Sequence, residues 1–228
     1  MMKSLTDQLN RPLHDLRISV TDRCNFRCLY CMPEEGMEWI PKEEVLSFEE
    51  IEKLVRTLAP LGIRKLRLTG GEPLLRRDLP ELVSMLRAVE GIEDIALTTN
   101  AVLLSEQAEA LRKSGLDRVN ISLDSLLKER FEQITRRDAL ERVLQGIEQA
   151  ARIFPGPLKI NAVLMRGLND GEIPAFAELA RENGHSVRFI EYMPLDADES
   201  WSRSALVSGA EIREQIDQHL EGKARLIE

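Results

Sequence analysis

Strand-like and helix-like segments alternate along most of the chain, and this alternation restricts the fold more than any other feature. Six segments have the length and composition of β-strands, and amphipathic segments with helical spacing lie between them. Repeated strand–helix units favour a parallel sheet with right-handed crossovers, and eight such units would close a barrel. The fold class predicted here is therefore α/β, a six-stranded parallel partial (βα)6 barrel. The expected strands are residues 16–21, 65–69, 94–99, 118–124, 158–164 and 187–192.

Capping residues indicate where helices begin. Ser47 and Glu50 have the spacing of a capping box and precede a helix that Pro60 and Gly62 should end. The same pattern recurs over residues 208–211. We expect residues 1–195 to form the partial barrel, and residues 196–228 to form a linker and the start of an incomplete C-terminal region.

Within the expected strands, apolar and polar residues alternate. Helices must cover the apolar face of a parallel sheet, so the polar side chains should line the interior of the barrel. Four of these polar residues are cationic: Arg17, Arg67, Lys159 and Arg188. Several buried cations are costly without an anionic partner, so the pattern predicts a cavity for a polyphosphate or a carboxylate. The alternative is a solvated sheet face.

All three cysteines, Cys24, Cys28 and Cys31, lie in one loop just after the first expected strand. This spacing does not suit a disulfide framework, and soft thiolates select iron–sulfur clusters, zinc or copper(I). Structural zinc sites and ordinary four-iron clusters use four protein ligands, and no fourth cysteine exists. An iron–sulfur cluster with one open iron is favoured. Zinc with a distant histidine and three unrelated buried thiols remain as alternatives.

Composition narrows the choice of partners. The chain has 31 Lys and Arg against 39 Asp and Glu, a formal net charge of −8, which argues against broad nucleic-acid binding. It contains no run of 18 apolar residues and no apolar core of a secretory signal near its N-terminus. We therefore expect a cytoplasmic protein that binds neither nucleic acid nor a membrane.

The second expected strand leads directly into Gly70-Gly71-Glu72-Pro73, at the same end of the barrel as the cysteine loop. Together with the Cys-x3-Cys-x2-Cys spacing and an aromatic residue, Tyr30, before the last cysteine, this motif resembles the radical S-adenosylmethionine (SAM) superfamily. Further stretches resemble the GTP 3′,8-cyclase family of molybdenum cofactor biosynthesis. They are residues 11–33, 67–76, 98–100, 120–124, 159–170 and 189–194.

The resemblance implies a lyase that converts GTP to (8S)-3′,8-cyclo-7,8-dihydroguanosine 5′-triphosphate. It implies that Cys24, Cys28 and Cys31 hold one [4Fe–4S] cluster, whose open iron binds SAM. The expected partners are GTP, a reducing electron donor and, as one possibility, a second copy of the chain, and no catalytic side chain is assigned. The implied SAM contacts are Tyr30, Gly71, Glu72, Ser122 and Met193. The implied GTP contacts are Arg17, Arg67, Thr98, Lys159 and Arg188.

Two departures from the family pattern keep alternatives open. The family has a second three-cysteine cluster near the guanine, but no cysteine follows Cys31 in this chain. Position 101 is alanine, where the family commonly has glycine. The alternatives are a catalytically incomplete fragment that binds the cluster and SAM but needs a C-terminal region or a partner, and a radical SAM enzyme with another substrate, such as a peptide.

Overall fold

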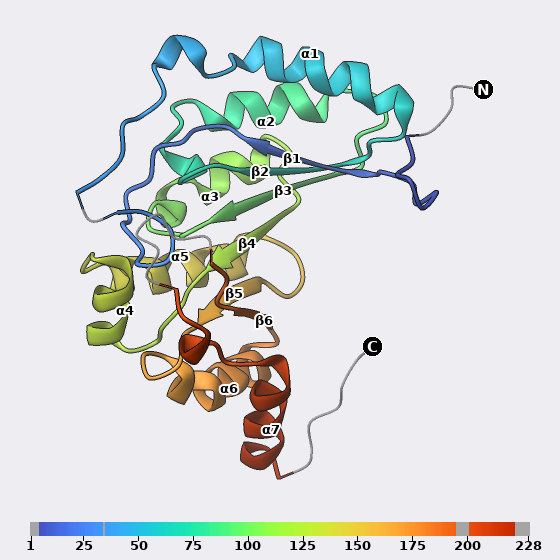
Figure 1. Ribbon diagram of the computed structural model, residues 1–228. Coiled ribbons are helices and arrows are strands. Elements are labelled where there is room, and N and C mark those ends of the chain that lie inside the picture. The colour runs from blue at the N-terminus through green and yellow to red at the C-terminus, as the bar shows by residue number, and fades with distance from the viewer. Residues whose placement is uncertain (1–4, 34, 195–200, 222–228) are drawn as a thin grey trace. The chain divides into compact units, whose positions relative to one another are not determined.

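The computed structural model describes residues 5–33, 35–194 and 201–221 (Figure 1). Within these residues one six-stranded sheet has the order β1-β2-β3-β4-β5-β6, and the pairs β1–β2, β2–β3 and β5–β6 are parallel. The α/β class and the chain-order arrangement expected from the sequence are confirmed. The strands are β1 (Asp15–Ser19), β2 (Lys65–Thr69), β3 (Asp94–Thr99), β4 (Arg118–Ser122), β5 (Lys159–Leu164) and β6 (Ser186–Glu191).

Helices and short 3-10 turns connect the strands. The α-helices are α1 (Phe48–Leu58), α2 (Leu79–Arg87), α3 (Leu104–Lys113), α4 (Lys128–Thr135), α5 (Leu140–Ile153), α6 (Ile173–Asn183) and α7 (Gly209–His219). The 3-10 helices are η1 (Lys42–Glu44), η2 (Ala59–Leu61), η3 (Pro73–Leu75), η4 (Asp170–Glu172) and η5 (Arg203–Ala205). Of these α-helices, α4 is the one that the sequence pattern did not predict.

Both expected capping boxes are present. The Ser47 hydroxyl accepts from the Glu50 N–H, and the Glu50 carboxylate accepts from the Ser47 N–H at 2.8 Å. Ser208 and Glu211 make the same reciprocal pair at the start of α7. Each box satisfies two backbone donors that a helix N-terminus otherwise leaves without partners.

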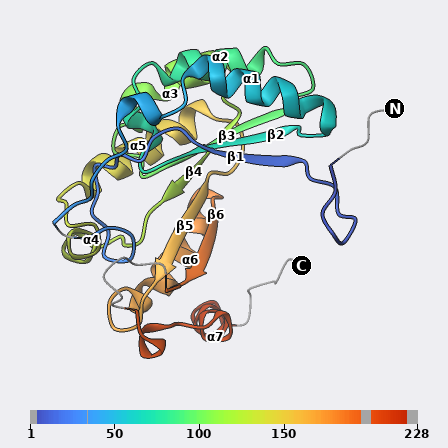
Figure 2. The same ribbon diagram turned by 45° about the horizontal axis from the view of Figure 1, so that its top comes forward.

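The chain divides into two units, each described here by itself. The first comprises residues 1–25, 38–120 and 144–156, and the second comprises residues 26–37, 121–143 and 157–228. In the first unit α1, α2 and α3 cover one face of β1, β2 and β3 (Figures 1 and 2). In the second unit α6 and α7 pack against each other and against β6. Residues 195–200 lie outside the described residues, so the expected boundary at residue 195 stays a prediction.

The alternation along the strands separates the core from a polar face, as expected. On β2, Leu66 and Leu68 are 1% and 0% exposed, whereas Arg67 between them is half-buried. The apolar side chains of β3 and β4 are buried in the same way. The helix-covered face therefore forms the core, and the opposite face presents the polar side chains that concern function.

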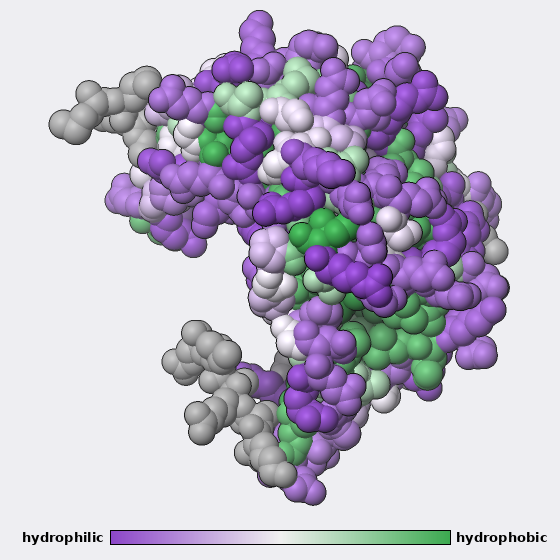
Figure 3. All heavy atoms as spheres, turned by 180° about the vertical axis from the view of Figure 1, so that it is seen from behind, coloured by the Kyte–Doolittle hydropathy of each residue, from purple (hydrophilic) through white to green (hydrophobic). Residues whose placement is uncertain are grey.

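On the face shown in Figure 3, hydrophilic side chains predominate and hydrophobic ones form smaller patches between them. No helix in the described part of the chain is both long enough and apolar enough to span a bilayer.

Candidate cofactor and substrate site

Glycines after β2 lie tightly against the loop that leads to the first cysteine. A Cβ at Gly70 would lie 2.3 Å from the Thr21 carbonyl oxygen, and one at Gly71 would lie 2.4 Å from the carbonyl oxygens of Asp22 and Arg23. The Gly71 N–H donates to the Thr21 oxygen at 2.8 Å. The glycines therefore allow two backbone segments to approach each other, which holds the residues just before Cys24 in place.

Glu72 has a structural task in this motif. Its side chain is 1% exposed and accepts from the Thr99 hydroxyl at 2.7 Å and from the Asn100 N–H at 2.7 Å. The Leu74 N–H donates to it at 3.1 Å. Burial raises the pKa of Glu72, although these three hydrogen bonds oppose the shift. The carboxylate thus joins η3 to the end of β3, and its implied contact with SAM stays a prediction.

The polar face of the first unit carries three of the implied GTP contacts. Arg17 on β1 is exposed, and Arg67 on β2 and Thr98 on β3 are half-buried. Asn120 on β4 is 3% exposed, and its Oδ1 atom has no hydrogen-bond partner among the described residues. A buried acceptor without a donor is energetically unfavourable, so we expect a ligand or a water molecule on this face to donate a hydrogen bond to Asn120 Oδ1.

In the second unit, Tyr30 is fixed by a buried carboxylate. Its hydroxyl donates to Asp124 Oδ2 at 2.6 Å, and its ring packs against Ile134, Met165 and Tyr192. Burial, together with the negative charge of Asp124, raises the pKa of Tyr30 well above its ordinary value. The residue between Cys28 and Cys31 is therefore tied to the segment just beyond β4.

Asp124 is itself held by its surroundings. It is 4% exposed, and its Oδ1 accepts from the Val163 N–H at 2.8 Å. Burial raises the pKa of Asp124 to about 6, against the lowering effect of the Tyr30 and Val163 hydrogen bonds. The buried Asn169 amide donates to the Asp124 carbonyl oxygen at 2.7 Å and to the Val163 carbonyl oxygen at 2.8 Å. This network fixes Asp124 relative to β5.

Helix α4 supports the cysteine loop from the same unit. The Arg27 and Leu29 N–H groups donate to the Thr135 and Ile134 carbonyl oxygens, each at 3.0 Å. At the start of the loop, Phe26 makes an edge-to-face contact with Phe131 of α4 at 5.7 Å between ring centroids. Helix α4 therefore contributes both hydrogen bonds and an aromatic contact to the position of the loop.

None of the three cysteines forms a disulfide; Cys24 and Cys28 are half-buried and Cys31 is exposed. Cys28 and Cys31 share a turn in which the Cys31 N–H donates to the Cys28 carbonyl oxygen at 2.9 Å. Cys24 belongs to the first unit and the other two cysteines to the second. No group of three or more His, Cys, Asp or Glu side chains in the described residues has a metal-holding arrangement. The donor chemistry fits an iron–sulfur cluster, and the ligand assignment stays a prediction.

The second unit also contains the remaining implied contacts. Lys159 at the start of β5 and Ser122 at the end of β4 are half-buried, whereas Arg188 on β6 is exposed. Met193, beyond β6, is 50% exposed. All four contacts stay predictions.

Sequence reasoning did not single out Asp124, Asn169, Asn120 or α4 as parts of the site. Asp124 and Asn120 stand in a stretch that resembles the cyclase family, which was a usable signal. The Tyr30–Asp124 hydrogen bond joins residues 94 positions apart, and nothing in local periodicity reports such a pairing.

Comparisons with known proteins agree with this geometry. The model of the radical SAM superfamily matches residues 18–180. The "GTP 3′,8-cyclase" of Paenarthrobacter nicotinovorans is 48% identical over 213 residues, 93% of this chain and 60% of that protein. The protein of the same name from Listeria welshimeri is 51% identical over 207 residues, 90% of this chain and 62% of that protein. The chain thus spans about three-fifths of the length of these curated relatives.

Solved structures share the fold at low sequence identity. Methylornithine synthase (PylB) has a TM-score of 0.69 and is 14% identical, with 91% of this chain and 62% of that chain covered. Streptococcus suis SuiB bound to S-adenosylmethionine has a TM-score of 0.66 and is 18% identical, with 92% and 48% covered. The family match extends over most of the sheet and both sequence motifs. This chain belongs to the radical SAM superfamily.

Proposed function

We propose that this chain is the radical SAM part of a GTP 3′,8-cyclase, the lyase of molybdenum cofactor biosynthesis. The observation that carries the proposal is the identity of 48–51% to proteins of that name over at least 90% of the chain. Superfamily membership brings two cofactors, a [4Fe–4S] cluster and SAM. When bound, they supply the radical chemistry that removes the hydrogen from the ribose 3′ carbon of GTP.

The protein's own residues bind and orient the ligands. Gly71 and the Tyr30–Asp124 pair hold the two ends of the cysteine loop, so that the loop needs little rearrangement when it receives a cluster. Pre-organisation of this kind lowers the entropic cost of binding. Tyr30, Ser122 and Met193 are the proposed SAM contacts besides Gly71 and Glu72.

Cationic side chains are proposed to bind the triphosphate. In the first unit these are Arg17 and Arg67, and in the second they are Lys159 and Arg188. Hydrogen bonds between guanidinium or ammonium groups and phosphate oxygens are stronger than neutral ones, and they fix the position of the nucleotide. Thr98 offers a hydroxyl on the same face as Arg67, and the Asn120 Oδ1 atom offers an acceptor for a ligand donor.

The first test is 5′-deoxyadenosine formation by protein reconstituted without oxygen, reduced, and supplied with SAM in the presence or absence of GTP. We expect formation that GTP stimulates, together with a cyclised guanine product. No formation by a chain that carries its full iron content would contradict the proposal.

A second test concerns the substrate contacts alone. Arg17→Ala and Lys159→Ala should each weaken GTP binding about tenfold, the effect of losing one charge-assisted hydrogen bond. Unchanged GTP binding in both variants would show that these residues do not form the GTP site. It would not affect the assignment of the cluster and SAM.

A second candidate function is supported by the cysteine count. Only three cysteines are present, all in the loop, so this chain offers no ligands for a second cluster. The second candidate is a catalytically incomplete chain. It binds the [4Fe–4S] cluster and SAM but turns over GTP only with a C-terminal region or a partner. Slow 5′-deoxyadenosine formation that GTP does not change, without a cyclised product, would favour this candidate.

The proposal includes a cytoplasmic location, a reducing electron donor and a homodimer. Sedimentation equilibrium of the reconstituted protein tests the homodimer directly, because it gives the mass in solution without reference to activity. A single species at the mass of one chain across the concentration range would exclude this part of the proposal.

A further inference from the structure

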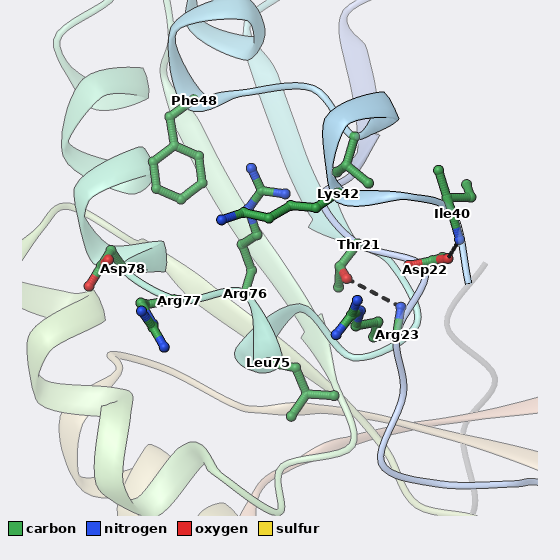
Figure 4. Close-up of a pocket in the computed structure, with 11 residues that line it drawn as sticks. Thr21, Asp22, Arg23, Ile40, Lys42, Phe48, Leu75, Arg76, Arg77 and Asp78 are labelled. Atoms are coloured by element: carbon green, nitrogen blue, oxygen red, sulfur yellow. Dashed lines mark hydrogen bonds between the residues drawn. The ribbon is translucent and has the colours of Figure 1, made fainter. Parts of the chain in front are cut away.

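The first unit contains a cavity of about 460 Å³ that none of the proposed SAM or GTP contacts lines (Figure 4). Its walls come from three segments: residues 21–23 after β1, residues 40–48 around η1, and residues 75–78 between η3 and α2. The volume falls in the range of cavities that bind small molecules.

Three exposed cations line this cavity. They are Arg23, Lys42 and Arg77, and within residues 5–33, 35–194 and 201–221 none of them forms an ion pair. Elsewhere in the chain, several exposed cations form helical ion pairs, such as Arg56 with Glu52 and Arg152 with Glu148. A group of cations without such partners creates a locally positive potential that attracts anions.

A fourth cation, Arg76, is already fixed in position. Its guanidinium donates to the Val20 carbonyl oxygen at 3.3 Å and to the Leu46 carbonyl oxygen at 2.9 Å, and it stacks over the Phe48 ring at 5.1 Å. A guanidinium has five N–H groups, so about three remain for a ligand. Because the side chain is already ordered, little conformational entropy is lost when it binds an anion.

The two acidic residues of the cavity do not neutralise these cations. The Asp22 carboxylate accepts from the Ile40 N–H at 2.6 Å. Figure 4 shows Asp22 and Asp78 at opposite edges, with Lys42 extended between them beside Arg76. With four cations against two carboxylates, the lining carries a net positive charge.

We propose that this cavity is a second anion-binding site that takes a phosphate-bearing ligand. Guanidinium and ammonium groups from three segments suit the several oxygens and the double charge of a phosphate group. The volume exceeds that of a single phosphate, and the apolar side chains of Ile40 and Leu75 offer a surface for a larger body such as a nucleoside. This inference does not depend on the proposed function.

Occupancy of the site bears on the cysteine loop. The cavity wall includes Thr21 and Arg23, whose carbonyl oxygens accept from the Gly71 and Glu72 N–H groups at 2.8 and 2.7 Å. A ligand that bridges Arg23 to Lys42 or Arg77 restrains the backbone that leads into Cys24. The site therefore offers a way for a phosphorylated metabolite to stabilise the loop.

Calorimetric titration of the whole chain, without cluster, with inorganic pyrophosphate at low ionic strength tests the proposal. Besides any binding at the proposed GTP contacts, we expect a site whose affinity falls at least tenfold in the double variant Lys42→Ala with Arg77→Ala, because each lost charged hydrogen bond costs about a tenfold change. The matched control, Lys53→Ala with Lys113→Ala, removes the same charge from exposed positions on α1 and α3 and should change the affinity less than about twofold.

Two further arms separate this site from the substrate site and identify the ligand class. Arg17→Ala should leave the affinity of the site that Lys42 and Arg77 line unchanged, because Arg17 does not line this cavity. Equal affinity for pyrophosphate and ADP would assign a free anion, and tighter ADP binding would assign a nucleotide. No pyrophosphate binding, or binding that Arg17→Ala abolishes and the Lys42 and Arg77 variant does not, would overturn the proposal. Circular dichroism confirms that each variant is folded.

Discussion

Because Gly71 has no side chain, its backbone can lie directly against the residues that lead to Cys24. A methyl group there would meet two backbone oxygens at 2.4 Å, and neither can move without displacing the residues before Cys24. The motif is thus a packing requirement as well as an implied cofactor contact. Its structural part can be tested without any cofactor.

Gly71→Ala should lower the free energy of unfolding by about 2 kcal/mol or more, because the added methyl group overpacks a backbone contact. Urea unfolding measures the change. Gly171→Ala is the control, since its added Cβ would meet only an Arg130 atom at 3.8 Å. An equal effect of both substitutions would show that the close approach at Gly71 is not what matters.

The backbone at Ala101 has a conformation that favours glycine, the residue that the family commonly has there. Its φ of 64° lies in the left-handed region that favours glycine, and the residue is fully buried. A residue with a Cβ costs about 1 kcal/mol more than glycine in this conformation. Ala101→Gly should therefore raise the stability by up to about 1 kcal/mol in thermal or urea unfolding. A clear loss of stability would show that the methyl group contributes more packing than strain.

Asp124 should make stability depend on pH. Burial raises its pKa from 3.8 to about 6, so the folded protein retains a proton that the unfolded chain releases. The protonated Asp124 side chain therefore contributes to the free energy of unfolding. This contribution is fully present below the pKa of the unfolded chain, 3.8, and it is lost as the pH rises through the folded pKa of about 6. The loss amounts to about 3 kcal/mol at most.

The check compares urea unfolding of the wild type and of Asp124→Asn at about pH 4.5 and about pH 7.5. Asparagine keeps the shape and cannot ionise, so the variant should lack this component of the pH dependence. Parallel pH profiles for the two proteins would exclude Asp124 as its source.

Among the secondary-structure elements, helix α4 makes contacts that position residues 26–29 of the cysteine loop. It is short, and its apolar positions are few, with Phe131 and Ile134 buried and most other residues charged or polar. The helix pattern in the sequence was therefore weak, and its boundaries lack a side-chain cap. Its backbone oxygens nevertheless accept from two N–H groups of the loop.

Phe131→Ala should cost about 3–5 kcal/mol, the usual loss for a buried phenylalanine. The side chain is 1% exposed and contacts Phe26 at the start of the loop. Leu127→Ala, at a position 47% exposed, is the control and should cost much less. Urea unfolding gives both values. Hydrogen exchange at Arg27 and Leu29 should accelerate in the Phe131 variant alone, and unchanged exchange would contradict the support that α4 is inferred to give.

At the scale of the whole molecule, periodicity predicted the architecture well. The six expected strands overlap β1 to β6; β2 and β3 match at both ends, and the ends of the others differ by at most two residues. Both capping boxes were confirmed because they are local, reciprocal pairs four residues long. The polar face was predictable too, since strand alternation alone determines it.

What the sequence could not predict depends on contacts between distant positions. The Tyr30–Asp124 and Glu72–Thr99 hydrogen bonds join segments that only folding brings together. Neither carboxylate stands in a pattern that distinguishes a structural role from a ligand contact. The burial of Glu72 and Asp124 indicates their structural roles, and burial becomes known only from the folded structure.

The cluster assignment has its own test on the whole chain. Cys24→Ala should reduce iron and sulfide bound after anaerobic reconstitution to a small fraction of the wild-type value, because a cluster loses one of its three protein ligands. Ser19→Ala, just before the loop, serves as the control. Iron content unchanged in the Cys24 variant would rule out the cluster at these cysteines.

The hydrogen bonds of the cysteine loop have a consequence for repair. The N–H groups of Arg27, Leu29, Cys31 and Met32 all donate to protein oxygens, so hydrogen bonds within the protein restrain the backbone of the loop independently of its thiol groups. A cluster destroyed by oxygen would then leave behind a folded receptacle rather than an unravelled one. Rebuilding the cluster from iron, sulfide and the required electrons would then begin on an ordered loop, and the same polypeptide could carry several clusters in succession.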